Sequence, residues 1–171
     1  MVDRTQRSPT DTRVGFGYDI HRFGPGRKLV LGGVHISHAR GLLGHSDADV
    51  LLHAICDALL GAAALGDIGM HFPDTDKRFK NIVSLDLLKN VRQLLKNQGF
   101  HVHNIDATVV LEHPKILPYI PRMKRKIGAA LGISATHVSV KATTNEGLGS
   151  IGSEEGCAAF AVAFIISNSN S

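Results

Sequence analysis

The chain has 171 residues, 43% of them hydrophobic, and a formal net charge of +4 at pH 7. This length and composition are typical of one soluble globular domain with its own core, and they exclude a disordered or fibrous chain. The longest apolar run, residues 157–166, is far short of the ~20 residues that a membrane helix needs. The basic run at 122–126 falls on a predicted helix and indicates a solvated face. We therefore expect neither membrane nor nucleic-acid binding.

The terminal segments and the cysteines bear on the cellular compartment of the protein. The first dozen residues have no apolar signal-peptide core, and they are too short and too acidic for a transit peptide. Cys56 and Cys157 are far apart and belong to no CxxC pair, which predicts free thiols in a reducing compartment. We predict a cytoplasmic protein with a flexible segment at 1–12, a single domain at 13–167 and a disordered tail at 168–171.

The first predicted strand covers residues 14–18, where large apolar side chains alternate with glycines. The alternation predicts one packed face, with Phe16 pointing inward. The extended chain continues through Asp19 and His21, which are two residues apart and therefore lie on the same side. Apolar triplets on either side of a Gly-Gly pair predict a β-hairpin at 29–36.

The segment 45–69, HSDADVLLHAICDALLGAAALGDIG, predicts a buried helix because apolar residues cover most of its circumference. Ser46 is a good N-cap, carboxylates follow in the first turn, and Gly66 supplies a stop. Polar side chains nevertheless recur every fourth position on one face: Asp49, His53 and Asp57. Buried polar groups need partners, so this face is a candidate for function.

The second half of the chain completes the predicted fold. Helices are predicted at 84–99 and 118–131, and strands at 105–111, 138–142 and 157–166. This order predicts an α+β fold, with a mixed four- to five-stranded sheet and helices packed on one face. Small or apolar residues on the other face indicate an oligomer.

Three residues of the first half suit a metal. Asp19 and His21 offer an oxygen and a nitrogen from one strand end, and His53 offers a second nitrogen. Two histidines and a carboxylate with an open fourth position are typical of catalytic zinc. The alternative is a polar strand end beside a hydrogen-bonded core histidine. Asp57 is either an acceptor that orients His53 or a carboxylate on the helix surface.

A second candidate site follows the strand at 138–142. Glu146 lies beside the hydroxyls of Thr143 and Thr144. The carboxylate suits Mg²⁺, while hydroxyls and loop amides suit phosphate. The alternative is an ordinary strand-to-loop turn. Two metals of different hardness, a positive net charge and glycine-rich loops together indicate diphosphate chemistry.

Five segments resemble the 2-C-methyl-D-erythritol 2,4-cyclodiphosphate synthase family, the cyclases of the non-mevalonate isoprenoid pathway. They are GYDIHRFG, LLGHSDADVLLHAICDALLGAAALGDIG, HFPDTD, HPKILPYIPRM and VKATTNEGLG, within about residues 13–166. The resemblance implies that the 2-phosphate of 4-diphosphocytidyl-2-C-methyl-D-erythritol 2-phosphate attacks the β-phosphorus, releasing CMP. It also implies a homotrimer whose sheets pack around a three-fold axis, with active sites between subunits.

The resemblance further implies roles for individual residues. Zinc would be held by Asp19, His21 and His53, and Mg²⁺ or Mn²⁺ by Glu146. His45 and Thr144 would stabilise charge in the transition state. The implied substrate contacts are Asp19, His21, His45 and Ser46 at the phosphates, Asp67, Ile68, Gly69, Phe72, Pro73, Asp74, Thr75 and Asp76 at the methylerythritol, Leu111, Glu112, His113, Pro114, Lys115, Ile116 and Leu117 at the cytidine, and Thr143, Thr144, Asn145 and Glu146 in the Thr-Thr-x-Glu run.

The chain also departs from its relatives. Ser150 and Ser153 replace an aromatic residue and an arginine that line the central cavity of many bacterial trimers. We therefore expect weak or no binding of isoprenoid diphosphates in that cavity. Two other functions remain open: a zinc-dependent phosphoesterase acting on a nucleotide diphosphate, and a non-catalytic zinc-containing nucleotide-binding module. The open fourth metal position argues against the module, because structural zinc is normally closed by four protein ligands.

Overall fold

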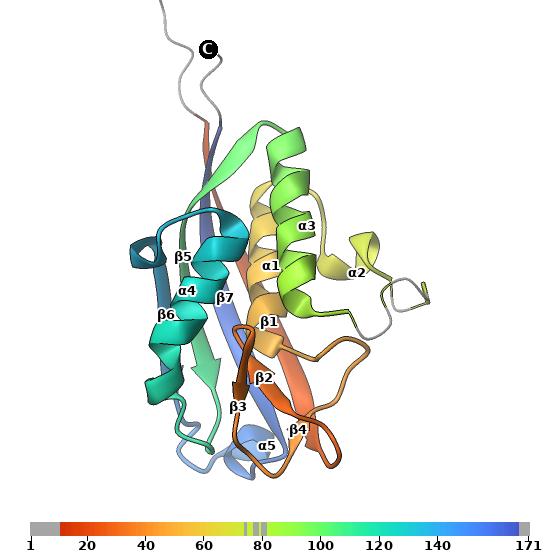
Figure 1. Cartoon of the computed structure of the whole chain (residues 1–171), viewed down its shortest axis with the longest axis vertical. Coiled ribbons are helices and arrows are strands. Elements are labelled where there is room, and N and C mark those ends of the chain that lie inside the picture. Colours follow the sequence, from red (N-terminus) through yellow and green to blue (C-terminus); the bar gives the residue numbers. More distant parts are fainter. Residues whose placement is uncertain (1–10, 74, 77–78, 80–81, 168–171) are drawn as a thin grey trace, which may run out of the picture.

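The computed structural model describes residues 11–73, 75–76, 79 and 82–167. A five-stranded sheet forms one layer, and α1, α3 and α4 cover one of its faces (Figure 1). The strands of this sheet, in spatial order, are β4 (Gly41–Leu42), β1 (Thr12–Gly24), β7 (Gly156–Ser167), β5 (Phe100–Val110) and β6 (Val138–Thr143). The helices are α1 (Val50–Ala62), α2 (Ile68–His71), α3 (Ser84–Asn97), α4 (Ile120–Leu131) and α5 (Gly149–Gly152), with 3-10 turns at Leu117–Tyr119 and Ala135–His137.

The sheet is mixed, as predicted. β7 pairs antiparallel with both β1 and β5, whereas β5 and β6 run parallel. The predicted hairpin is also confirmed, as an antiparallel pair of β2 (Leu29–Leu31) and β3 (Val34–Ile36). No separate strand or helix was predicted from the sequence for the short β4 or for the one-turn helices α2 and α5. None of the described helices is long and apolar enough to cross a membrane.

The prediction that Phe16 points inward is wrong, because the glycine face of β1 is the packed one. Phe16 is 64% exposed. A Cβ atom at Gly15 or Gly17 would collide with the backbone carbonyl of Ala58 or Ala54 on α1. Only residues without a side chain allow the helix to lie this close to the strand. The close approach brings the face of α1 that carries His53 next to β1.

The start and end of α1 also differ from the sequence prediction. Asp49, not Ser46, is the N-cap, and its carboxylate accepts from the backbone N–H of Leu52. The helix ends at Ala62, well before Gly66, because Ala64 already has a left-handed conformation with φ of 57°. Asp49 is fully buried and also accepts from the backbone N–H groups of Gly32 and Gly33, so it joins the β2–β3 hairpin to the helix.

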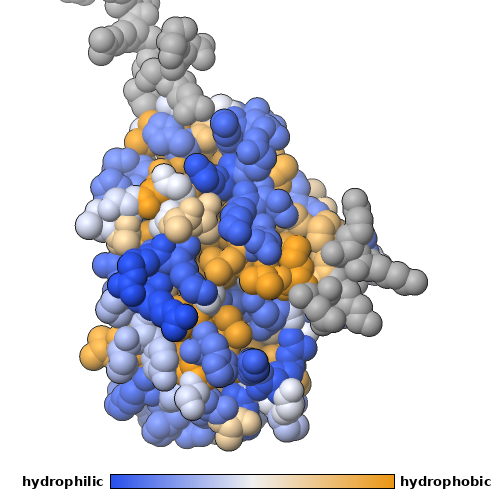
Figure 2. All heavy atoms as spheres, in the orientation of Figure 1, coloured by the Kyte–Doolittle hydropathy of each residue, from blue (hydrophilic) through white to orange (hydrophobic). Residues whose placement is uncertain are grey.

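The other two long helices form as the sequence predicts. Leu88, Val91 and Leu95 of α3 are buried, as are Met123 and Ile127 of α4. The surfaces of α3 and α4 that face solvent are hydrophilic (Figure 2). The amphipathic pattern of each helix predicts which of its faces is buried, because the apolar stripe packs against the sheet.

The face of the sheet opposite the helices is apolar near β1 and β7. Its exposed large side chains there are Val14, Phe16, Tyr18, Ile20, Phe160 and Val162. The Phe160 ring packs at a centroid distance of 5.0 Å from Tyr18. Such a contiguous apolar patch is typical of an interaction surface. Of the predicted terminal segments, only residues 11 and 12 are described, and β1 already begins at Thr12.

Candidate functional site

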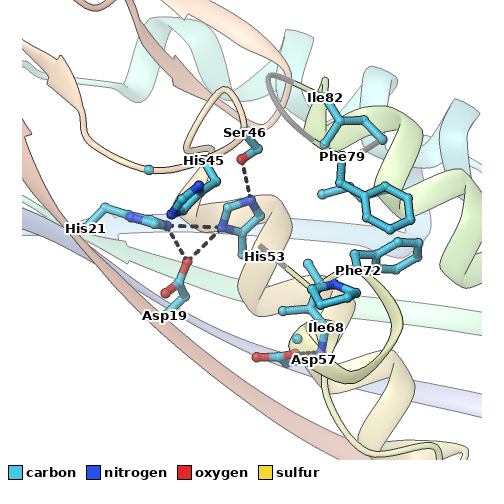
Figure 3. A pocket seen from close by; sticks show the side chains of 14 residues that line it. Asp19, His21, His45, Ser46, His53, Asp57, Ile68, Phe72, Phe79 and Ile82 are labelled. Carbon is cyan, nitrogen blue, oxygen red and sulfur yellow. Dashed lines mark hydrogen bonds and ion pairs between the residues drawn. The ribbon is translucent and has the colours of Figure 1, made fainter. Parts of the chain in front are cut away.

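Three side chains converge where β1 and α1 meet (Figure 3). Asp19 Oδ2 lies 2.9 Å from His21 Nε2 and 3.0 Å from His53 Nδ1. The two ring nitrogens are 3.1 Å apart. The sequence prediction that the Asp-x-His pair meets the helical histidine is therefore confirmed. Two nitrogens and one carboxylate oxygen at these separations fit a divalent metal ion.

Hydrogen bonds on the far side of each ring orient the two histidines. His21 Nδ1 lies 2.8 Å from the backbone carbonyl of Leu43, which can only accept. Nδ1 of His21 therefore donates to this carbonyl, and its Nε2 faces the cluster. His53 Nε2 lies 3.0 Å from the hydroxyl oxygens of both Ser46 and Ser84.

The charges of the cluster are mutually dependent. Burial acts to raise the pKa of Asp19, but hydrogen bonds from His21 and His53 outweigh it and hold the pKa well below its usual range. Burial acts to lower the pKa of His21, but its hydrogen bond and attraction to Asp19 outweigh that effect and raise the pKa. The carboxylate is thus held ionised, as a metal ligand must be, and a cation bound there would take the place of the proton that Asp19 favours on His21.

The cluster lies in a cavity of about 390 Å³, here called the metal pocket. Its lining residues are Asp19, His21, Gly44, His45, Ser46, His53, Asp57, Ile68, Gly69, Phe72, Pro73, Phe79, Ile82 and Leu87. One wall is polar, and the wall around Phe72 and Ile82 is apolar (Figure 3). The cavity can therefore hold a phosphate near the cluster and a carbon skeleton against the apolar wall.

The predicted methylerythritol residues contribute unequally to the metal pocket. Ile68, Gly69, Phe72 and Pro73 line it, whereas Asp67 caps α2 by accepting from the backbone N–H of Met70 at 2.9 Å. Thr75 and Asp76 are described but do not line this cavity, and Asp74 lies outside the described residues.

Asp57 takes a role that neither sequence interpretation anticipated. Its Oδ1 accepts from the backbone N–H of Ile68 at 2.8 Å, while His53 pairs with Asp19 and the two serines instead. Burial raises the pKa of Asp57. The carboxyl therefore holds the turn that begins at Asp67 against α1.

A second cavity of about 410 Å³, here called the β6 pocket, opens beside β6. Its lining residues are Leu111, Glu112, Pro114, Lys115, Ile116, Leu117, Ile120, Val140, Lys141, Ala142, Thr143 and Thr144. The predicted cytidine segment and the Thr-Thr pair are thus neighbours in space, although about 30 residues of sequence separate them. Among the described residues, the two cavities have no lining residue in common.

The loop after β6 is held by Glu112. Its Oε1 accepts from the backbone N–H of Asn145 at 2.7 Å and lies 3.4 Å from that of Gly147. Between them Glu146 has a φ of 52°, and its carboxylate accepts from the Thr144 hydroxyl at 3.0 Å. His113 turns away from the pocket and pairs with Glu154 at 2.8 Å.

Sequence reasoning missed Asp47 and Ser84 as parts of the site. Ser84 is fully buried, and its hydroxyl lies between Asp47 and His53. The sequence identified Ser84 only as a helix start. Its partners are more than 30 residues away, so no local pattern could have revealed the contact.

Comparisons with known proteins agree with this geometry. A model of the YgbB family matches residues 12–166. The 2-C-methyl-D-erythritol 2,4-cyclodiphosphate synthase of Syntrophobacter fumaroxidans is 62% identical over 156 residues, which are 91% of this chain and 98% of that protein. The bifunctional IspDF from Campylobacter jejuni superposes with a TM-score of 0.90 at 42% identity, covering 94% of this chain but 43% of that longer one. IspF of Plasmodium falciparum, in complex with CDP, gives 0.81 at 34% identity, covering 94% and 99%.

Proposed function

This chain belongs to the YgbB family, and on that premise we propose that its two pockets carry out the cyclisation for which its relatives are named. The enzyme converts 4-diphosphocytidyl-2-C-methyl-D-erythritol 2-phosphate to 2-C-methyl-D-erythritol 2,4-cyclodiphosphate and releases CMP. The phosphoesterase and binding-module alternatives are not favoured, because relatives matched over 98% of their length are named synthases.

The observation that carries the residue assignment is the triangle formed by Asp19, His21 and His53. Its two nitrogens and one oxygen lie within 3.1 Å of one another and leave a fourth position open toward the cavity. This donor set is that of catalytic zinc, and we assign zinc to it. Zinc bound there supplies a Lewis acid that polarises a phosphoryl oxygen.

Glu146 is the proposed ligand of a second, harder cation, Mg²⁺ or Mn²⁺. Its carboxylate is exposed and hydrogen bonded to the Thr144 hydroxyl, so it is held on the rim of the β6 pocket. Oxygen donors beside a phosphate site suit Mg²⁺, which usually keeps several waters and binds phosphate oxygens.

The reaction needs no protein nucleophile. An oxygen of the 2-phosphate bonds to the β-phosphorus while the bond from that phosphorus to the CMP oxygen breaks. The chain's contribution is to hold the two phosphates in line and to offer donors where charge develops. His45, at the polar wall of the metal pocket, is one proposed donor (Figure 3). Thr144, in the β6 pocket, is the other, once its hydroxyl proton turns from Glu146 to the substrate.

The substrate is divided between the pockets. The residues from Leu111 to Leu117 hold cytidine, and the apolar wall near Phe72 holds the methylerythritol. The CDP complex of the Plasmodium falciparum relative supports a cytidine nucleotide as the bound group. Because the two pockets are separate in one chain, we assign each active site to the metal pocket of one subunit and the β6 pocket of the next.

The proposed assembly is a cytoplasmic homotrimer. The apolar face of the sheet supports a close contact between copies, since Val14 and Phe16 are 65% and 64% exposed in the single chain. Three sheets packed around an axis would bury these side chains. The two free cysteines, both buried, fit a reducing compartment.

Turnover of the authentic substrate by the purified protein, with metal analysis of the same sample, tests the proposal. We expect zinc in the protein, and CMP and the cyclic diphosphate as products in phosphorus NMR. In water enriched in oxygen-18, neither product should gain a solvent oxygen. One labelled oxygen per turnover would identify a phosphoesterase and overturn the cyclase assignment.

A further inference from the structure

A chain of hydrogen bonds runs from His53 away from the metal pocket, through the buried Ser84 to Asp47. The hydroxyl of Ser84 donates to Asp47 Oδ1, and the Ser84 backbone N–H lies 3.2 Å from both carboxylate oxygens. The same Ser84 Oγ lies 3.0 Å from His53 Nε2. Ser84 is fully buried at the first position of α3, so bulk water does not compete for its hydroxyl.

The direction of these hydrogen bonds follows from what each group can donate. A carboxylate only accepts, so the single hydroxyl proton of Ser84 is committed to Asp47. What Ser84 offers His53 is therefore a lone pair, and the proton in that contact must come from His53 Nε2. His53 Nδ1 lies 3.1 Å from His21 Nε2 and 3.0 Å from Asp19 Oδ2. A metal bound by the cluster takes the place of the proton that Nδ1 can share with Asp19, so the one N–H of the neutral ring is then at Nε2.

We propose that Ser84 and Asp47 are positioning residues that hold His53 in its Nε2–H tautomer and thereby present the Nδ1 lone pair to the metal. Leu43 does the same for His21 through a carbonyl. In this arrangement the Ser84 hydroxyl accepts from His53 Nε2 and donates to Asp47, so it links the His53 ring to the Asp47 carboxylate. Such outer contacts normally set the tautomer and basicity of metal-binding histidines.

Ser46 provides the internal comparison. Its hydroxyl oxygen is also 3.0 Å from His53 Nε2, but it accepts from the backbone N–H of Ala48 at 3.0 Å. Its own proton is not committed to a carboxylate: the nearest alternative is Ser84 Oγ at 3.4 Å. Ser46 can therefore donate to the ring or accept from it, and it is compatible with either tautomer.

This inference rests on the metal assignment of the proposed function, so its test includes a measurement without metal. Ser84→Ala, Ser46→Ala and Asp47→Asn are purified metal-free with nitrogen-15 histidine, and thermal melting confirms that each is folded. The His53 signals are assigned by their loss in His53→Gln. Nitrogen NMR then reports which ring nitrogen carries the proton, and competition with a chromophoric chelator gives the zinc affinity.

In the wild type and Ser46→Ala, Nε2 of His53 should carry a proton, and the two zinc affinities should agree within about threefold. Ser84→Ala should show a mixture of tautomers and bind zinc about 10–100-fold more weakly. Asp47→Asn should resemble Ser84→Ala, because an amide can donate to Ser84 Oγ and turn the hydroxyl proton toward the ring. This second variant decides the question if Ser84→Ala does not fold.

Retention of the Nε2–H tautomer in both Ser84→Ala and Asp47→Asn would overturn the inference, and so would a loss of zinc affinity with no change of tautomer. Failure of the wild type to bind zinc would instead refute the metal assignment. In that case the tautomer measurement still decides whether Ser84 orients His53.

Discussion

The metal pocket and the β6 pocket have similar volumes but are built in opposite ways. At the metal pocket, Asp19, His21 and His53 are held to one another within 3.1 Å and by further hydrogen bonds behind each ring. At the β6 pocket, Thr144 and Glu146 stand on an exposed loop that Glu112 holds by its backbone. The first brings its three donors together within one chain, whereas the second lies between the segment 111–120 and the strand end at 140–144.

This difference shows what each pocket needs for its task. Metal donors must be aligned before the ion binds, so the protein half-buries these three side chains and gives each of them hydrogen-bond partners. A nucleotide brings its own polar groups and can be closed over by a neighbouring copy. The comparison therefore predicts that the metal pocket tolerates no loss of a donor, and that the β6 pocket acts only through a second subunit.

The largest effect is expected from His53→Ala. It removes one of the three metal donors and leaves Asp19 and His21 with only each other in the cluster. Metal Lewis acidity contributes several kcal/mol to such reactions, so turnover should fall at least ~1,000-fold, with loss of zinc from the protein. His35→Ala, on the exposed side of β3, is the matched control and should retain both. Full zinc content and activity in His53→Ala would refute the metal site.

The metal donors are the part of the site that could be predicted from sequence. Alternation along a strand places Asp19 and His21 on one side, and the helical period selects the face that carries His53. The amphipathic α3 and α4 were predictable for the same reason. In each case the information is local, because spacing alone determines which side chains share a face.

The sequence predictions were wrong where contacts between distant segments determine the structure. The large side chains of β1 point away from the core because α1 needs the space above Gly15 and Gly17. Asp49 replaces Ser46 as the helix cap because the hairpin glycines present two more N–H groups to its carboxylate. The contact between Ser84 and His53 could not be predicted, because no local sequence pattern indicates that α3 begins beside α1.

The next largest effect concerns the β6 pocket and its proposed second metal. In Glu146→Gln the side-chain oxygen can still accept from Thr144, so the loop keeps its hydrogen bond and loses only charge. Turnover should fall about 100-fold and require more Mg²⁺, while zinc content stays unchanged. Glu155→Gln, another exposed carboxylate, serves as the control. A normal Mg²⁺ response in Glu146→Gln would exclude this role.

A smaller effect tests whether the pockets of different subunits combine. His53→Ala damages the metal pocket and Lys115→Ala damages the β6 pocket, so each variant alone should be nearly inactive. In equal mixtures that have exchanged subunits, about a quarter of the intersubunit sites are intact, and activity should recover to that level. Mass spectrometry of tagged subunits confirms the exchange. No recovery after proven exchange would mean that each chain carries a complete site.

The smallest expected effect is a pH dependence of stability that comes from the buried carboxyl group of Asp49. Burial raises the pKa of Asp49 from 3.8 to about 6, even though three backbone N–H groups donate to it. Between these two values the folded state binds more protons than the unfolded state, so the contribution of Asp49 to stability is largest at low pH. It falls as the pH rises from about 4 to 6 and is constant above that range.

Asp49→Asn isolates this contribution, because asparagine does not titrate. The variant should be less stable at every pH, since its amide places an N–H against one of the backbone donors. The stability difference between the wild type and the variant should shrink by about 2–3 kcal/mol from pH 4 to pH 6. Urea unfolding of the metal-free proteins at several pH values measures it. Parallel curves for the wild type and Asp49→Asn would show that folding does not raise the pKa of Asp49 and would contradict this prediction.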